Sequence, residues 1–272
     1  MLEALQFEFM RNALIAGLLA GVACGVIGTF VVVNRIVFIS GGIAHAAYGG
    51  IGLAFFFGLS PTLGILGFSL FVSVLMAFIS LKAKHRADTI IGVLWALGMA
   101  LGVALLDLTP GYNVDLMSYL FGSILTVPTS DLWLMLLLNG LIILIVAYFY
   151  HDLVALSYDE EFAQIRGVPV KLLYFLLMAM IALSVVMIIQ VVGLILVIAL
   201  LTIPPYIAEK FSKSLLGMMF YSILLNLFFA SAGLWLSYTF NLTSGASIIM
   251  VGGLCFFISL LLKHVRPKRG IP

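Results

Sequence analysis

Long apolar segments recur along the whole 272-residue chain. They fall at 13–33, 43–58, 62–81, 90–106, 132–150, 172–189, 191–208, 215–236 and 245–262. A helix needs ~20 apolar residues to cross the hydrocarbon core of a bilayer, and most of these segments approach that length. Because 64% of the residues are hydrophobic and 9% are charged, no polar stretch is long enough to enclose a separate soluble core. We therefore predict an all-α polytopic membrane protein with eight or nine transmembrane helices, in which residues 1–272 form a single domain.

The basic residues predict the orientation of these spans. In a nine-span threading, all but Arg11 of the 13 Lys and Arg residues fall on one side: Arg35, Lys82, Lys84, Arg86, Arg166, Lys171, Lys210, Lys213 and the Lys263–Arg269 tail. The positive-inside rule makes this side, with the C-terminus, cytoplasmic, and it places the N-terminus outside. Asp107 and Asp131 then contribute to an acidic bias of the outer face, which would concentrate cations. Solvated acids at loop ends would look the same.

One histidine, His45, lies inside the second apolar segment. If residues 39–57 are helical, Gly41, His45 and Gly49 are spaced four residues apart on one face. Small residues at this spacing allow another helix to approach closely, so His45 is expected to face protein or a water-filled path. An ionisable group at membrane depth is a functional hypothesis by default. A histidine that merely hydrogen-bonds to a neighbouring helix is the alternative, and the spacing alone favours that alternative.

The first span carries Gly17, Gly21 and Gly25, a repeated small-xxx-small pattern typical of a tightly packed transmembrane helix. Cys24 and Cys255 lie far apart inside apolar segments and fit packing roles better than a disulfide or a metal site. The sequence shows no catalytic triad, metalloprotease motif or phosphate-binding loop. We therefore expect a transport subunit and not an enzyme, with any ATP hydrolysis on a separate chain.

Two stretches on the predicted cytoplasmic side differ from the rest. Residues 157–167 are expected to form a short amphipathic helix with acids in its first turn, and Gly167 is expected to end it. Farther along, Pro204-Pro205 lies at the inner end of an apolar segment. Paired prolines there are expected to break the helix and to start a short new one over about 206–212.

Taken together, the motifs resemble the permease subunit of metal-ion ABC importers, the zinc, manganese and iron(II) uptake family. The likeness is carried by Gly28-Thr-Phe-Val-Val-Val through Gly42-Ile-Ala-His45-Ala, by Glu161-Phe-Ala-Gln-Ile-Arg-Gly167, by Val192-Gly193 through Pro204-Pro205-Tyr-Ile-Ala208, by Leu120-Phe-Gly-Ser-Ile-Leu125 and by Ser237-Tyr238 with Ser244-Gly-Ala246. Each motif is weak alone, but they cover nearly the whole chain in the right order.

This resemblance implies a type II-like ABC importer permease in the cell membrane. A homodimer of such permeases would sit on two ATP-binding subunits and would receive its cargo from an extracytoplasmic metal-binding protein, with no nucleic acid as partner. The residues that would match the coupling helices docking on the ATPase are Pro204, Pro205, Tyr206, Ala208, Glu209 and Lys210.

The resemblance also implies that His45 is a metal-path residue. Family members commonly have Gly-Asp where this chain has Ser40-Gly41, so the carboxylate one turn before the histidine is missing here. His45 would then act alone, with its dimer mate, or with residues of other helices.

We therefore expect the permease of an ATP-driven importer of a divalent transition metal. We expect Zn²⁺ as the transported ion ahead of Mn²⁺ or Fe²⁺, because a lone imidazole with little carboxylate suits zinc better than manganese. The metal is cargo, and no cofactor is expected on this chain. The alternatives are a permease for a metal chelate or vitamin, an ATPase-independent secondary transporter, and an intramembrane assembly protein. Co-purification of a nucleotide-hydrolysing subunit separates the two permease hypotheses from the other two.

Overall fold

The computed structural model describes residues 6–82, 86–110, 124–194 and 197–262. Within these ranges all regular secondary structure is helical, as expected for an all-α protein. Eight helices are long and apolar enough to cross a membrane. The prediction of a polytopic helical membrane protein is therefore confirmed.

The helices follow the chain with short connections. Their bounds are α1 Glu8–Val33, α2 Val37–Ala46, α3 Tyr48–Phe57, α4 Pro61–Lys82, α5 Ala87–Asp107, the 3₁₀ turn η2 Ile124–Thr126, α7 Thr129–Tyr148, α8 Tyr150–Tyr158, α9 Glu160–Ile165, α10 Val170–Val192, α11 Val197–Phe211, α12 Leu215–Phe240 and α13 Ser244–Leu261. The Leu120–Leu125 motif falls largely outside the described residues. So do Lys84 and the Lys263–Arg269 tail.

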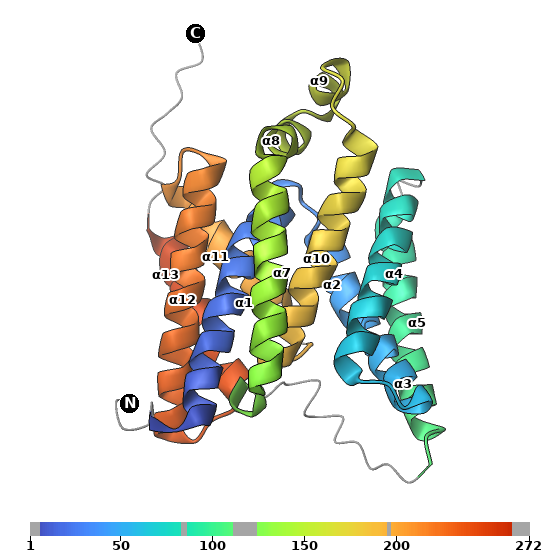
Figure 1. Cartoon of the computed structure of the whole chain (residues 1–272). Coiled ribbons are helices and arrows are strands. Elements are labelled where there is room, and N and C mark those ends of the chain that lie inside the picture. Colours follow the sequence, from blue (N-terminus) through green and yellow to red (C-terminus); the bar gives the residue numbers. More distant parts are fainter. Residues whose placement is uncertain (1–5, 83–85, 111–123, 195–196, 263–272) are drawn as a thin grey trace.

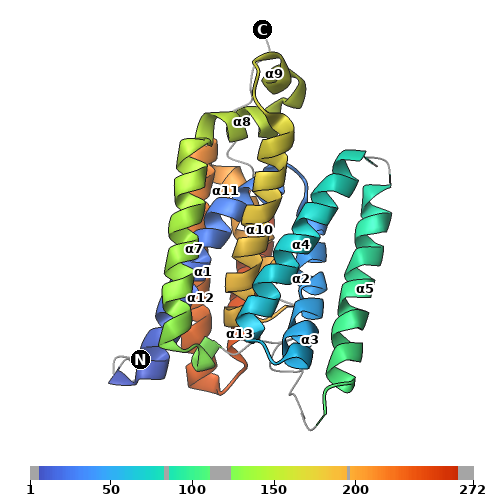
Figure 2. The same ribbon diagram turned by 45° about the vertical axis from the view of Figure 1, so that its right-hand side comes forward.

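The helices form two groups joined through α10 (Figures 1 and 2). In the first group α1 is central and packs against α7, α10, α11 and α12, while α13 covers α11 and α12. In the second group α2, α3, α4 and α5 pack together, and α4 and α2 contact α10. Helix α5 lies at the outer edge, where α2, α3 and α4 are the described elements that it contacts.

The chain starts at one end of the bundle, and its last helix points toward the other (Figure 1). The seventh apolar segment forms α11, a helix of 15 residues. At 1.5 Å per residue it is about 22 Å long, which is short of the hydrocarbon core. It nevertheless returns the chain from the end of α10 to the start of α12. As a result Arg35, Lys82, Lys171 and Lys213 gather at the end of the bundle opposite to Glu8.

The interface of α1 is built on glycine. A methyl group added at Gly25 would lie 2.7 Å from the backbone nitrogen of Ile223 in α12, and one at Gly28 would lie 2.5 Å from the carbonyl oxygen of Leu201 in α11. Gly17 and Gly21 also face α12, at 3.2 Å from the Cβ of Ala230 and 3.3 Å from that of Asn226. Helix α1 therefore approaches two neighbours at backbone distance, as small-residue transmembrane contacts allow.

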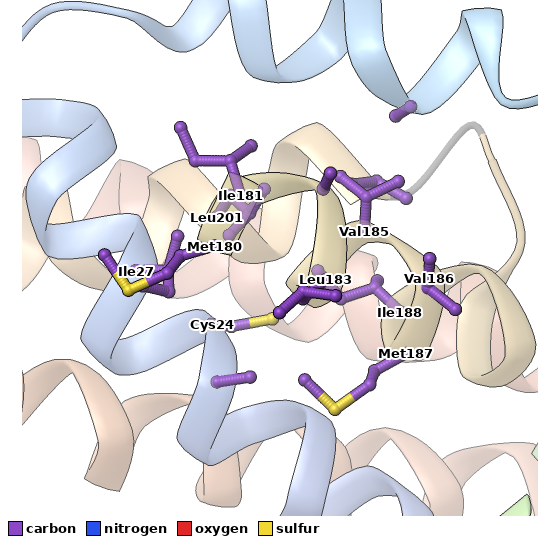
Figure 3. Packing of buried hydrophobic residues seen from close by; sticks show 14 of the residues in the cluster. Cys24, Ile27, Met180, Ile181, Leu183, Val185, Val186, Met187, Ile188 and Leu201 are labelled. Carbon is purple, nitrogen blue, oxygen red and sulfur yellow. The ribbon is translucent and has the colours of Figure 1, made fainter. Parts of the chain in front are cut away.

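The buried hydrophobic cluster runs through most of the helices, and the part of it between α1, α10 and α11 is shown in Figure 3. In this view Ile27 of α1 lies beside Met180 of α10, and the sulfur of Cys24 points toward Leu183 of α10. Both cysteines of the chain are free, and Cys24 is fully buried in this cluster. This matches the expectation of packing residues without a disulfide.

Pro204 and Pro205 do not break the chain as predicted. Both lie inside the continuous helix α11, so the prediction of a new helix from about 206 is wrong. A proline removes the hydrogen bond to the carbonyl four residues earlier, which for Pro205 is the carbonyl of Leu201. That carbonyl faces Gly28 of α1, whose lack of a side chain lets the two backbones meet. Neighbouring helices commonly compensate for proline in transmembrane helices in this way.

The amphipathic helix expected over 157–167 is confirmed in shortened form as α9. Asp159 caps it, because its carboxylate accepts a hydrogen bond of 2.9 Å from the backbone nitrogen of Phe162. Glu160 and Glu161 occupy the first turn, and Gly167 ends the helix with a φ of +80°.

Candidate functional site

His45 lies near the middle of the second span, just before the point where α2 gives way to α3. The two helices are separated by Ala47 alone and together form one span of 21 residues, Val37–Phe57. Ala44 and Ala46 beside it are fully buried, whereas His45 is partly exposed. The structure thus brings one ionisable ring to an accessible position at membrane depth.

The ring of His45 stacks on the indole of Trp95 in α5. Their centroids are 4.2 Å apart and the ring planes are inclined by 12°. The indole Nε1–H in turn donates a hydrogen bond to the Sδ of Met99, one turn later on α5, at 3.2 Å. Phe38 of α2 also contacts the indole, with ring centroids 6.0 Å apart and ring planes inclined by 46°.

The two nitrogens of the imidazole have different surroundings. Nδ1 is buried and has no hydrogen-bond partner among the residues that the structure describes. The exposed part of His45 therefore excludes Nδ1, which leaves Nε2 as the nitrogen that an approaching ion can reach. A histidine held by a hydrogen bond to a neighbouring helix, the alternative for this residue, is not what these contacts show.

The glycines around His45 bring the neighbouring helices close. A methyl group at Gly41 would lie 2.7 Å from the Cδ1 of Ile198 in α11. One at Gly49 would lie 2.9 Å from the carbonyl oxygen of Gly98 in α5. Gly41 supplies no ligand atom, so the missing carboxylate is not replaced at that position.

No group of three or more His, Cys, Asp or Glu residues that could hold a metal ion occurs in the described part of the chain. His45 is therefore not part of a closed, multi-ligand metal site within this stretch of the protein. One imidazole with one accessible nitrogen can bind a transition metal weakly and release it, as a transport path requires.

The residues expected to couple to an ATPase are mostly hidden. Pro204, Pro205, Ala208 and Lys210 are buried, and Tyr206 is the exposed member of the set. Lys210 donates a hydrogen bond of 2.8 Å to the carbonyl oxygen of Ser259 in α13. This segment therefore faces other helices of the same chain.

Helix α9, in contrast, is largely exposed. It lies at the same end of the bundle as α8, beyond the first turn of α10 (Figure 1). Phe162 and Ile165 are 49% and 85% exposed, and Arg166 follows them. An apolar surface at the end of the bundle, flanked by charge, has the composition of a protein contact.

Sequence reasoning missed Trp95 and Met99. Trp95 and Met99 lie at least fifty positions after His45, on a helix whose apolar pattern is ordinary. In an apolar segment, a tryptophan and a methionine spaced four residues apart are typical of lipid-facing or core positions. No pattern along the chain showed that α5 lies against His45.

The fold and the site together define a polytopic helical permease with a single accessible imidazole at membrane depth. The comparisons specify the class further. The model of the ABC 3 transport family matches residues 6–263, and the chain belongs to that family. It is a permease subunit of the ABC metal transporters and not an enzyme.

The similar proteins span nearly the whole chain. A membrane protein of Synechocystis sp. is 52% identical over 97% of this chain and 94% of its own length. The manganese transport system membrane protein MntC of Halalkalibacterium halodurans is 31% identical over 99% and 91%. Among solved structures, PsaBC from Streptococcus pneumoniae in complex with Fab is 31% identical, covers 98% of this chain and 96% of that chain, and has a TM-score of 0.87.

Proposed function

We propose that this permease passes a divalent transition metal ion into the cytoplasm, driven by ATP hydrolysed on a separate subunit. The observation that carries this proposal is the accessible imidazole of His45 at membrane depth, in a chain of the ABC 3 transport family. The relatives named as manganese transport proteins support a metal cargo. The ion is the substrate and not a resident cofactor.

Zn²⁺ is the favoured ion within this proposal, ahead of Mn²⁺ and Fe²⁺. Imidazole suits zinc, whereas manganese prefers carboxylate and carbonyl oxygens. Gly41 offers no oxygen one turn before His45, and Trp95 and Met99 beside the ring are not hard ligands. The manganese-named relatives favour Mn²⁺ instead, so uptake of both ions has to be measured in competition.

Two copies of the permease meet at α5 in this proposal. Gly92, Ala96, Ala100 and Ala104 lie four residues apart on a face of α5 that the described helices leave largely uncovered. The outward face of α7 carries large residues such as Trp133, as expected toward lipid. Small residues at this spacing favour a close helix–helix contact, so a second α5 is the partner that we propose.

The basic end of the bundle faces the cytoplasm, because Lys and Arg are enriched in cytoplasmic loops. Helix α9 is at this end, and its exposed Phe162 and Ile165 form the surface that we propose to dock on the ATPase. This replaces the buried Pro204–Lys210 segment as the main contact. The opposite end, with Glu8, is where an extracytoplasmic metal-binding protein would deliver the ion.

The test is metal uptake by the complete complex, in cells that lack their own importers. His45→Ala and His45→Asn should leave assembly with the ATPase intact and should lower zinc uptake at least about tenfold, the size of a lost ligand interaction. The matched control is His151→Asn, because His151 is exposed on α8. Normal transport by His45→Asn would show that the metal path lies elsewhere.

A further inference from the structure

The imidazole of His45 is held in place by a ring and not by a hydrogen bond. Metal-binding histidines usually donate their second ring N–H to a carboxylate or a carbonyl, which fixes the orientation of the ring. Here Nδ1 is buried with no such acceptor among the described residues, and Gly41 offers none one turn away. The contact that can orient the ring is the nearly parallel stack on Trp95, at 4.2 Å and 12°.

Trp95 is itself fixed by its neighbours. Its Nε1–H donates to the Sδ of Met99 at 3.2 Å, and Phe38 lies against it at 6.0 Å. The indole is therefore held by a hydrogen bond at its Nε1–H edge and by a tilted contact with the Phe38 ring, while the imidazole stacks on it. A rigid aromatic surface of this kind restricts both the position and the tilt of a ring stacked on it.

We infer that Trp95 is a positioning residue that holds the His45 imidazole against α5, so that Nδ1 stays buried and Nε2 alone meets the transported ion. This inference rests on the proposed function, because it assigns to Trp95 a role in the same path. Binding through one nitrogen on a stacked ring is selective for metals that accept imidazole. It is also weak enough for the ion to leave.

Trp95 also links the ion site to α5, the helix that we propose to lie at the dimer contact. His45 belongs to α2, whereas both Trp95 and Met99 belong to α5. A displacement of α5 relative to α2 would separate the stacked rings and release the imidazole from its binding orientation. The stack therefore makes metal affinity depend on the relative position of two helices.

The first experiment uses Trp95 as its own reporter in the purified permease–ATPase complex. The chain has three tryptophans, and Trp133 and Trp235 are 66% and 49% exposed. Trp133→Phe and Trp235→Phe together leave Trp95 as the single tryptophan of the permease. Co²⁺ should quench its emission saturably, and Zn²⁺ should restore it. Adding His45→Asn should abolish the quenching, while adding His151→Asn should not.

The second experiment measures Zn²⁺ affinity of the same complex by equilibrium dialysis, with Trp95 varied. Trp95→Leu removes the stack and should weaken binding about tenfold or more, as loss of an orienting partner does. Trp95→Phe keeps an aromatic face and should recover most of the affinity. Met99→Leu keeps the volume but loses the sulfur acceptor, and it should have an intermediate effect. Thermal unfolding of the variants separates the two explanations, because a general packing defect would lower stability in parallel with affinity, whereas loss of the stack alone would lower affinity and leave the unfolding temperature unchanged.

The outcomes separate this inference from the proposed function. If His45→Asn abolishes uptake while Trp95→Leu binds Zn²⁺ with unchanged affinity, the positioning role is wrong and the function stands. If Co²⁺ quenching is absent, or survives in His45→Asn, no ion meets His45 beside Trp95 and the inference is overturned. If His45→Asn transports normally, the proposed path itself fails.

Discussion

Lys210 is a basic residue, yet it is only 8% exposed near the C-terminal end of α11. Its Nζ donates to the carbonyl oxygen of Ser259 at 2.8 Å and to the hydroxyl of Ser259 at 3.2 Å, and it lies 5.0 Å from the ring centroid of Tyr206. The last four carbonyls of a helix lack partners within that helix, and Ser259 belongs to the last turn of α13. Lys210 therefore caps α13 and joins it to α11.

We predict that Lys210→Met lowers the free energy of unfolding by ~1–2 kcal/mol, because the carbonyl of Ser259 loses a charge-assisted hydrogen bond while the apolar stem is kept. Thermal unfolding in detergent measures this effect. Lys213→Met is the matched control, because Lys213 is exposed. If Lys210→Met is as stable as the parent protein, the free-energy cost of desolvating the ammonium group equals the stabilisation from its hydrogen bonds, and the prediction is wrong.

At the scale of the helix, the contact of α1 with α12 leaves no room for a side chain at Gly25. An added methyl group would lie 2.7 Å from a backbone nitrogen and 2.8 Å from the Cα of Ile223. Backbone atoms cannot rotate away as a flexible side chain can. The two helices must separate to admit even an alanine.

We therefore predict that Gly25→Ala destabilises the membrane domain by ~1–3 kcal/mol, the usual cost of overpacking. Gly67→Ala in α4 is the control, since no atom lies within 4 Å of the added methyl group. It should be neutral or slightly stabilising, because alanine is the better helix former by ~1 kcal/mol. Equal effects of the two substitutions on detergent stability would contradict the close approach.

Helix α9 allows a separate test of the ATPase surface. Ile165→Asp places a charge on a side chain that is 85% exposed, so the fold should survive, whereas an apolar contact with the ATPase should not. We expect the ATPase to be lost on purification and uptake to fall at least about tenfold, as for a central interface residue. Leu242→Asp, on an exposed residue at the opposite end of the bundle, should retain the ATPase. Retention by Ile165→Asp would exclude α9 as the docking surface.

At the scale of the whole molecule, the direction of the bundle in the membrane follows from charge. The end with α8 and α9 carries all of the described Lys and Arg residues except Arg11, and the acids are found at both ends, with Glu8, Asp107 and Asp131 at the end opposite α8 and α9. Import requires the ATPase at the basic end and the metal-binding protein at the other. The orientation of the bundle therefore determines whether the proposed transport is import.

Single-cysteine labelling tests this orientation. With Cys255→Ala and the buried Cys24 retained, Thr243→Cys should react with a membrane-impermeant maleimide in intact cells, while Gln164→Cys should react only after permeabilisation. Both positions are exposed in the permease, and the permease is expressed without the ATPase because Gln164 lies on the proposed docking surface; accessibility to the reagent is then limited by the membrane alone. Labelling of Gln164→Cys from outside would reverse the topology and with it the proposed docking surface.

The sequence by itself determined the features that depend on single segments. Apolar length predicted the spans, since each helix must cover the hydrocarbon core on its own. The cluster of acids in its first turn and Gly167 after it predicted the limits of α9 to within a few residues, because the helix dipole and the left-handed backbone are local properties. His45 could be singled out because an ionisable side chain in an apolar segment is conspicuous without any knowledge of its neighbours.

The tertiary structure alone decided what each of these residues touches. The prolines of α11 predicted a helix break, yet the helix is continuous, and the carbonyl of Leu201 that Pro205 leaves unbonded lies against Gly28 of α1. Lys210 read as a surface residue, yet α13 provides its acceptors. Trp95 gave no signal, yet it holds the ring of His45. Such contacts join residues far apart in the chain, and the approach of two helices depends on all the side chains between them, which no local pattern records.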